Sequence, residues 1–281
     1  MIKAVQQFML GTVTNNEKQA METLSAIKAA GYDGIELCGF IIRPTPLIVQ
    51  LLTQAAGMPT GRGGKLNWLH MTNEAGLSVV SIHEDLDHIE KEPQAIVDEA
   101  RHYHTDTIVV TGMYRFDYRS EQAVRHLAAR LNQADKMLAE QKIRLLYHNH
   151  NVELLHISAA QCAWDILLNE TDPACVNFEF DSYWYTEAGG DAQAMMRRLG
   201  SRMKLWHIND RGTKQRSIPM TPIIKSDSME LGTGNMPLDA LCDTAKLIGI
   251  DAVILESHRN WIDHSPVRSL QVSAEYLNRQ F

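Results

Sequence analysis

Four side chains that can bind a metal ion stand at the ends of short apolar stretches in the second half of the chain. In chain order they are His148, Asp181, His207 and Glu256. Two imidazoles and two carboxylates suit a divalent cation such as Mn²⁺, Zn²⁺, Co²⁺ or Fe²⁺. One such residue alone is usually a capping or solvated group, but four in succession are hard to assign to chance. The pattern therefore predicts one divalent metal ion, without choosing among these elements.

The chain alternates short β-rich runs with longer helical runs, which is typical of a parallel sheet with helical crossovers. The predicted strands are Val5–Gly11, Gly34–Cys38, Leu77–His83, Thr107–Thr111, Arg144–His148, Val176–Phe180, Met203–His207 and Ala252–Leu255. The predicted helices are Glu17–Ala30, Lys65–Ala75, Glu121–Gln141 and Pro266–Asn278. Eight β/α units in 281 residues favour one (β/α)₈ TIM-barrel domain over residues 1–281. All strand carboxyl ends of such a barrel meet at one rim, so the predicted ligands would come together there.

An open doubly wound sheet is the second architecture that fits this alternation. It usually has a glycine-rich phosphate loop after its first strand, and the stretch 8–15 contains only Gly11. The segment Gly212–Glu230 is long, polar and interrupted by two prolines, so we expect a loop over the rim. Four basic residues in or beside it permit a phosphorylated or acidic substrate: Arg211, Lys214, Arg216 and Lys225.

Composition narrows the class of protein. The formal net charge of −7 disfavours a nucleic-acid partner, which normally needs a basic patch. The four cysteines are scattered without a C-x-x-C pair, so we expect neither a disulfide framework nor a thiolate zinc site. No apolar run approaches the ~20 residues of a membrane span, and the first residues lack a signal-peptide apolar region. We therefore expect a cytoplasmic enzyme of small molecules that does not bind membranes.

Several local patterns resemble the xylose isomerase-like TIM-barrel superfamily of sugar phosphate isomerases, epimerases and dehydratases. The resemblance covers essentially the whole chain. It is carried by five stretches: Gly31–Leu37 (GYDGIEL), Tyr147–His150 (YHNH) followed by Glu153, Asp181–Trp184 (DSYW) followed by Gly189–Asp191, Leu205–Arg211 (LWHINDR) and Leu231–Asn235 (LGTGN). The resemblance implies a (β/α)₈ barrel, a sugar or polyol substrate and a homo-oligomer.

In such families the metal is usually held by Glu, Asp, His and Glu from strands five to eight. Asp181, His207 and Glu256 match the last three of these ligands. The first departs, because the common E-N-H of strand five is here His148-Asn149-His150. Either His148 takes the place of this first ligand, or Glu153 supplies the missing carboxylate. We expect His148 to bind the metal and Glu153 to be an extra ligand or an acid/base.

The resemblance implies proton transfer beside a carbonyl group. A metal that chelates adjacent carbonyl and hydroxyl oxygens acidifies the C–H between them and stabilises the ene-diolate. Glu256 or Glu153 would remove the proton as the catalytic base. Isomerisation, epimerisation and loss of a β-hydroxyl share this chemistry. We therefore expect an isomerase or epimerase, with a dehydratase or lyase acting on a keto sugar or inosose as the alternative.

Five residues are candidates for substrate contact. His83 ends strand three and could bind a sugar hydroxyl or the backbone, and His150 should point to the same side as His148 because strand side chains alternate. Trp184 could stack on an apolar sugar face. Glu36 could contact substrate or be the buried partner of a nearby Arg or Lys. Arg259 could bind a carboxylate or phosphate, or be an ordinary surface arginine.

Two other functions fit the same superfamily. An endonuclease for abasic DNA with three zinc ions would need a histidine where Trp184 stands, and the acidic charge also disfavours it. A barrel that binds sugar without catalysis is favoured by the departure from Glu at His148. These readings differ in a measurable way, since a binding module would bind sugar without turnover.

Overall fold

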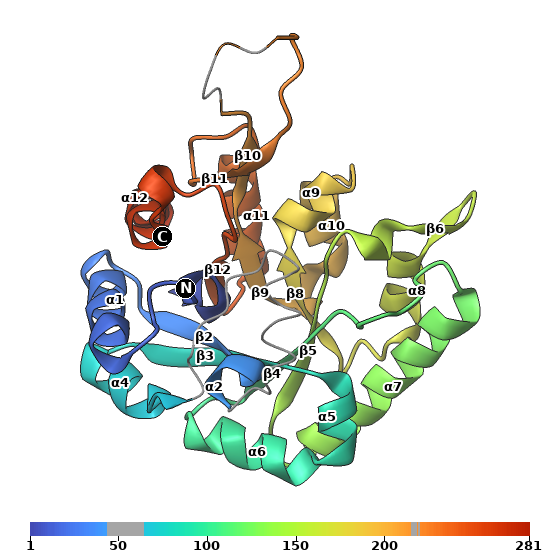
Figure 1. The fold of residues 1–281 in the computed structure, drawn as a ribbon. Helices are drawn as coiled ribbons and strands as arrows, with labels where there is room; N and C mark the ends of the chain where they lie inside the picture. Colours follow the sequence, from blue (N-terminus) through green and yellow to red (C-terminus); the bar gives the residue numbers. More distant parts are fainter. Residues whose placement is uncertain (44–64, 215–217, 219) are drawn as a thin grey trace. The chain divides into compact units, whose positions relative to one another are not determined.

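A computed structural model describes residues 1–43, 65–214, 218 and 220–281 of the chain. Eight parallel strands are hydrogen-bonded in the order β1-β12-β9-β8-β5-β4-β3-β2 and close a barrel (Figure 1). They are β1 Ile2–Gln6, β2 Gly34–Cys38, β3 Ser78–Glu84, β4 Thr107–Thr111, β5 Arg144–His148, β8 Asn177–Asp181, β9 Met203–Ile208 and β12 Ala252–Leu255. The closed barrel confirms the predicted (β/α)₈ architecture and excludes the open doubly wound sheet.

The predicted first strand is wrong over most of its length. Strand β1 ends at Gln6, and Gln7–Leu10 forms the 3₁₀ helix η1 instead of continuing to Gly11. The cause is local, because the Gln6 side chain accepts a hydrogen bond from the Phe8 backbone N–H at 2.8 Å and caps the turn. This early stop places Gln6 at the end of its strand.

Helices follow most of the strands. They are α1 Glu17–Ala29, α2 Gly39–Ile42, α4 Trp68–Ala75, α5 Leu86–Lys91, α6 Pro93–His102, α7 Glu121–Ala139, α8 Ala163–Glu170, α9 Ser182–Glu187, α10 Ala192–Leu199, α11 Leu238–Ile248 and α12 Pro266–Gln280. The helix predicted from Lys65 begins at Trp68, because Asn67 caps it by accepting from the His70 N–H at 3.1 Å. None of the described helices combines the length and apolar character that crossing a membrane requires.

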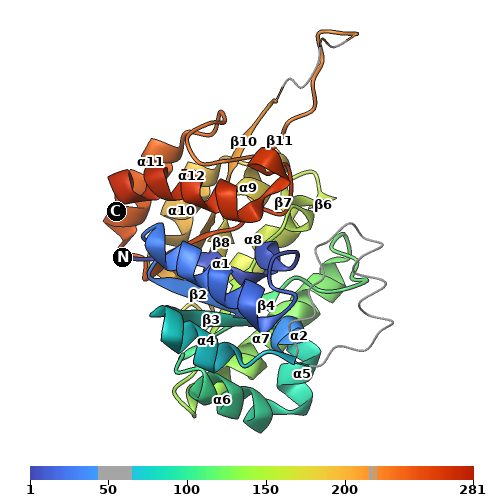
Figure 2. The same cartoon turned by 60° about the vertical axis from the view of Figure 1, so that its left-hand side comes forward.

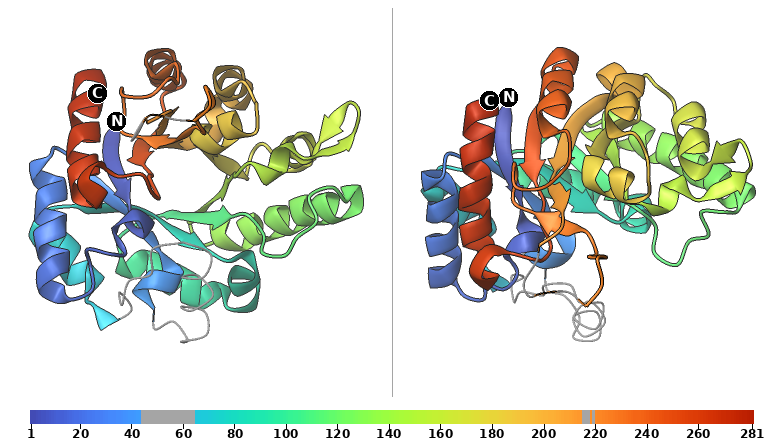
Figure 3. Two further views of the ribbon diagram at one scale, coloured as in Figure 1. Left: turned by 45° about the horizontal axis from the view of Figure 1, so that its top comes forward. Right: turned by 90° about the horizontal axis from the view of Figure 1, so that it is seen from above.

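The described residues form two compact units. The first contains Met1–Ser78, His207–Asp243 and Ala252–Phe281, and the second contains Val79–Trp206 and Thr244–Asp251. In the first unit α12 packs along α1, and both chain ends lie together (Figure 2). In the second unit α7 packs against α8 (Figure 3). The extent of one domain over residues 1–281 stays a prediction.

The segment Gly212–Glu230 is not one irregular loop. Strands β10 Asp210–Gly212 and β11 Asp227–Met229 pair antiparallel and form a hairpin at its base. The prediction missed this hairpin because its strands have three residues each, too few to show an alternating pattern. Arg216 and Pro219 of this segment lie outside the described residues.

Strand β8 shows how the sequence directs polar side chains to the barrel interior. Phe178 and Phe180 point to one face and pack on the ring of Trp164 in α8, with ring centroids 5.5 and 6.4 Å away. Because strand side chains alternate, Glu179 and Asp181 point to the opposite face. All four side chains are buried. The two phenylalanines hold the strand against α8 and thereby fix the direction in which Glu179 and Asp181 point.

Candidate metal and substrate site

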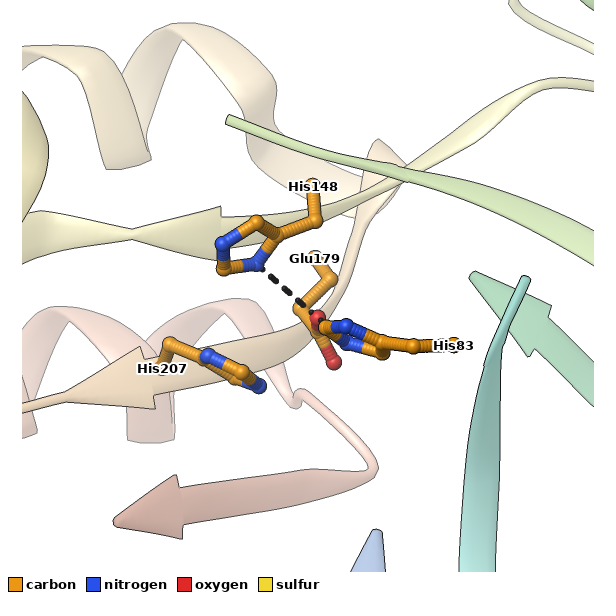
Figure 4. A group of neighbouring side chains, drawn as sticks. All are labelled: His83, His148, Glu179 and His207. Carbon is orange, nitrogen blue, oxygen red and sulfur yellow. Dashed lines mark hydrogen bonds and ion pairs between the residues drawn. The ribbon is translucent and has the colours of Figure 1, made fainter. Parts of the chain in front are cut away.

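A cluster of two imidazoles and one carboxylate lies in the second unit. This His148 cluster contains His83 at the penultimate position of β3, His148 at the end of β5 and Glu179 in β8 (Figure 4). The Glu179 Oε2 atom lies 2.7 Å from His83 Nε2 and 3.0 Å from His148 Nδ1. The exposed fractions are 7%, 1% and 0% for His83, His148 and Glu179. Burial on this scale requires that each polar group finds partners inside the protein.

The register of the sheet creates this cluster. Strands β5 and β8 pair with His148 directly opposite Glu179. Partners at the same level of a parallel sheet point to the same face, so the imidazole and the carboxylate meet. Glu179 was not among the residues that the sequence pattern indicated. The signal was present, because Glu179 stands two residues before Asp181 and therefore on the same face of the strand.

Asp181 ends β8 and also caps the next helix. Its Oδ1 atom accepts the Trp184 N–H at 2.7 Å, the geometry of an N-cap at α9. Asn149 locks the strand end to β5, since its side chain exchanges hydrogen bonds with the Asp181 backbone N–H and C=O at 2.9 and 3.1 Å. The middle residue of the H-N-H pattern thus has a structural task that the sequence did not suggest.

His150 and Trp184 extend the row of rings that begins in the His148 cluster. The His150 ring lies 4.9 Å from the His148 ring and 6.3 Å from the Trp184 ring, measured between centroids. Both His150 and Trp184 are half-buried. The structure therefore brings together three of the predicted substrate or metal residues, from the end of β5, the turn that follows it and the beginning of α9.

Glu153 lies beneath this row in a buried hydrogen-bond network. Its Oε1 atom accepts from the Tyr147 hydroxyl at 2.6 Å, and its Oε2 atom accepts from the His150 N–H at 2.9 Å. Tyr147 is joined to the Tyr118 hydroxyl at 3.1 Å. Burial raises the pKa of Glu153 to about 7, although these hydrogen bonds oppose the shift. A carboxyl with this pKa exchanges its proton near neutral pH.

The first unit holds a second cluster of titratable groups. This His207 cluster contains Glu36 in β2, His207 in β9, Glu256 after β12 and His258. The His207 Nε2 atom lies 2.6 Å from Glu36 Oε2, and its Nδ1 atom lies 2.9 Å from Glu256 Oε2. The other Glu256 oxygen lies 3.3 Å from His258 Nε2. One imidazole is therefore held between two buried carboxylates.

Glu36 has a different partner from the Arg or Lys considered for it. Besides His207, its Oε2 atom accepts from the Gln6 side-chain amide at 2.8 Å. Gln6 and Glu36 are register partners in β1 and β2, and both are almost fully buried. The early end of β1 places Gln6 at this level. Gln6, like Glu179, was not among the residues that the sequence indicated.

Arg259 contacts the β10–β11 hairpin. Its Nε atom donates to Asp227 Oδ1 at 2.8 Å, at the start of β11, and the arginine side chain is 65% exposed. Lys214 reaches a buried carboxylate, since its Nζ atom lies 3.2 Å from Glu230 Oε2. Both basic residues thus help to hold the β10–β11 hairpin and the loops beside it.

Comparison with known proteins agrees with the barrel. Residues 24–280 match the sequence model of the xylose isomerase-like TIM-barrel family. No curated protein matches the chain. Among solved structures, a sugar phosphate isomerase/epimerase from Parabacteroides distasonis is 21% identical with a TM-score of 0.73, over 98% of this chain and 93% of that chain.

Two further solved structures have a similar fold. The probable 3-DHS dehydratase AsbF, involved in petrobactin synthesis in Bacillus anthracis, is 14% identical with a TM-score of 0.67 over 99% of both chains. The IOLI protein with a bound zinc atom is 14% identical with a TM-score of 0.67, over 100% of this chain and 98% of that chain. At these identities the likeness shows the fold alone.

Proposed function

The chain belongs to the xylose isomerase-like TIM-barrel family, and on this premise we propose that it is a divalent-metal-dependent isomerase or epimerase of a small sugar, sugar phosphate or polyol. The proposal rests on one observation above all. His148, Asp181, His207 and Glu256 are buried, with exposed fractions of 1%, 2%, 0% and 7%. Buried imidazoles and carboxylates offer the nitrogen and oxygen ligands that a divalent ion takes in proteins. The structural likeness to a sugar phosphate isomerase/epimerase supports the same reaction class.

We propose these four residues as the ligands of one metal ion. They are one of two sets among the described residues that could hold an ion, the other being His83, His148, Glu179 and His207. The first set is preferred because its residues stand at strand ends, the level at which barrel active sites lie. Glu179 lies one pleat lower, two residues before the end of β8. Two imidazoles favour Zn²⁺, Mn²⁺, Co²⁺ or Fe²⁺ over Mg²⁺.

A bound divalent ion would supply Lewis-acid polarisation of a carbonyl oxygen and stabilise the negative charge of an ene-diolate. The protein would provide the proton transfers. Glu256 and Glu153 are the proposed acid/base residues, and the Glu153 pKa of about 7 allows it to give or take a proton at neutral pH. His83, His150, Trp184, Glu36 and Arg259 remain the proposed substrate-contact residues, with Glu36 and Arg259 tied to the partners described above.

A dehydratase or lyase on a keto sugar or inosose is the second candidate. It is supported by the structural likeness to a probable dehydratase. The same proton abstraction followed by loss of a β-hydroxyl would produce it, so the ligand set serves both reactions. Product analysis separates them, since elimination releases water and isomerisation conserves the composition of the substrate.

The first test is metal content together with proton exchange. Elemental analysis of the purified protein should find about one divalent metal ion per chain, and Asp181→Asn should lose most of it. Asp191→Asn is the matched control, because Asp191 also caps a helix, accepting the Ala194 N–H at 2.9 Å, and is exposed. Asparagine caps helices as well as aspartate does, so both variants should fold.

Substrates can then be sought by solvent exchange. Keto and aldo sugars, free and phosphorylated, are incubated with the metal-loaded protein in D₂O, and deuterium at the carbon next to the carbonyl is detected by NMR. Exchange that Asp181→Asn abolishes and Asp191→Asn retains supports the proposal. A wild-type protein that takes up no metal from added Zn²⁺, Mn²⁺, Co²⁺ or Fe²⁺ contradicts it and favours a barrel that binds sugar without catalysis.

A further inference from the structure

Each histidine among the proposed ligands contacts a buried glutamate that is not itself a proposed ligand. Glu179 contacts His148 and Glu36 contacts His207. Both glutamates are 0% exposed and belong to the barrel strands themselves, in β8 and β2. Burying a carboxylate costs free energy unless it is paired. Two buried glutamates that each contact a histidine ligand therefore indicate a role at these ligands.

The two contacts involve opposite nitrogens of the imidazole ring. Glu179 Oε2 faces Nδ1 of His148 at 3.0 Å, whereas Glu36 Oε2 faces Nε2 of His207 at 2.6 Å. The same Glu179 Oε2 atom also lies 2.7 Å from His83 Nε2 (Figure 4). An ionised carboxylate only accepts hydrogen bonds, so a nitrogen that faces a carboxylate outside the ligand set must carry a hydrogen. In a neutral imidazole the other nitrogen then carries the lone pair that binds a metal.

We propose that Glu179 and Glu36 are positioning residues that fix the tautomers of the two histidine ligands in opposite senses. Glu179 holds His148 as the Nδ1–H form, which binds the metal through Nε2. Glu36 holds His207 as the Nε2–H form, which binds the metal through Nδ1. This inference rests on the proposed function, since it assigns the atoms of the same metal site.

The surroundings of each glutamate support this role. His207 Nδ1, the nitrogen assigned to the metal, faces Glu256 at 2.9 Å. Because Glu256 is itself a proposed ligand, an ion held by both groups would replace this hydrogen bond, whereas Glu36 would keep its contact with Nε2. Glu36 is held in place by the Gln6 amide at 2.8 Å. Glu179 is fixed by the sheet, because it is the register partner of His148 and its strand neighbours Phe178 and Phe180 are anchored on Trp164. Hydrogen bonds of this kind orient a ligand ring and raise its basicity.

The variants Glu179→Gln and Glu36→Gln test the proposal. Glutamine keeps the shape but offers a neutral amide, so the facing imidazole loses its fixed tautomer. We expect each variant to bind Zn²⁺ about 10- to 100-fold more weakly than wild type by competition with a chelator. Glu230→Gln is the control, since Glu230 is also buried but contacts Ser269, the Ile262 N–H and Lys214. Zinc affinities equal to that of Glu230→Gln would overturn the proposal.

The tautomers themselves can be read on the wild-type protein, whatever the folding of the variants. Protein with ¹⁵N-labelled histidine is studied by NMR with and without Zn²⁺, and His148→Gln and His207→Gln assign the signals. With zinc we expect a hydrogen on Nδ1 of His148 and on Nε2 of His207. The reverse assignment at either ring overturns the role of its glutamate.

The two proposals fail separately in this design. If wild type binds zinc and both glutamine variants bind it equally well, the positioning role is wrong and the metal site stands. If wild type binds no zinc, the proposed function fails. The metal-free His148 signal then decides the role of Glu179, because Nδ1–H supports it and Nε2–H overturns it.

Discussion

Glu179 lies directly opposite His148 in the paired strands β5 and β8, and its Oε2 atom is 3.0 Å from His148 Nδ1. His148 is the residue at which the chain departs from the families that it resembles, so this contact matters for the proposed metal site. Their common glutamate is replaced by a neutral imidazole, which lowers the negative charge among the ligands. A carboxylate behind the imidazole returns negative charge to the region and strengthens the nitrogen as a ligand. The departure at His148 is thus compatible with a working metal site.

Metal addition should stabilise the folded protein through binding linkage. An ion that binds only the folded state at 100 times its dissociation constant adds about 2.7 kcal/mol to the free energy of unfolding. We expect added Zn²⁺ to raise the melting temperature of wild type and Asp191→Asn, and a chelator to reverse it. Asp181→Asn and His207→Gln should respond little. Equal zinc responses in all four proteins would mean that the ion binds elsewhere.

The loop before α11 should depend on one carboxylate. Asp210 is 1% exposed, and its two oxygens accept the N–H groups of Gly232, Gly234 and Met236 at 3.0, 2.9 and 3.1 Å. Asp210→Asn places an amide donor against these donors, so we expect a loss of about 2–3 kcal/mol in urea unfolding. Asp243→Asn, an exposed aspartate in α11, is the control.

Gly234→Ala tests the same loop from the other side. A Cβ atom at Gly234 would lie 2.7 Å from the Arg211 carbonyl oxygen and press on the Asp210 carboxylate. Backbone atoms cannot yield cheaply, so alanine should destabilise the loop by about 1–3 kcal/mol. Gly189→Ala provides no such clash, because nothing lies within 4 Å of its Cβ position, although its φ of +88° adds strain of its own. A Gly234→Ala variant as stable as wild type would show that the loop yields.

The sequence predicted the site residues at strand ends better than the residues behind them. Asp181, His207 and Glu256 follow apolar runs, so the reversal from apolar to polar marks them. Glu179 lies within its strand, where a buried carboxylate carries no such boundary signal, and Glu36 was predicted only as a substrate contact or the partner of an Arg or Lys. Their partners depend on which strands are neighbours and in what register, which only the closed sheet reveals. The exact end of β1 was also missed, since a hydrogen bond that the Gln6 side chain accepts from the Phe8 N–H decides it.

The apolar face of β8 should carry stability without touching metal binding. Phe178 is fully buried, packs on Trp164 at 5.5 Å and lies under the Arg202 guanidinium at 4.7 Å. Phe178→Ala should cost about 3–5 kcal/mol in unfolding free energy, because it leaves a cavity in the core. The exposed Tyr114→Ala should cost little. If folded Phe178→Ala binds zinc as wild type does, the two faces of the strand act independently; weaker binding would show that they are coupled.

The buried Glu153 should make stability depend on pH in an unusual direction. Its pKa rises from 4.5 to about 7 on folding because burial disfavours the charged form. Between these values the folded protein keeps a proton that the unfolded chain has released, so the unfolding free energy falls as pH rises. The unfolding free energy is therefore about 3 kcal/mol lower above pH ~7 than below pH ~4.5. Glu153→Gln cannot release a proton, so its stability should lack this fall.

Urea unfolding from pH 4.5 to 8 in the presence of a chelator measures the difference, with the exposed Glu275→Gln as the control. Glutamine, like the neutral carboxyl, has one carbonyl oxygen and one donor group beside the Tyr147 hydroxyl and the His150 N–H, so Glu153→Gln should lie close to wild type at low pH. The variant should become the more stable of the two as pH rises, while the difference in unfolding free energy between wild type and Glu275→Gln stays constant. A gap between wild type and Glu153→Gln that does not change with pH would mean that Glu153 is already ionised in the folded protein near pH 5, too acidic to exchange its proton at neutral pH as the proposed acid/base.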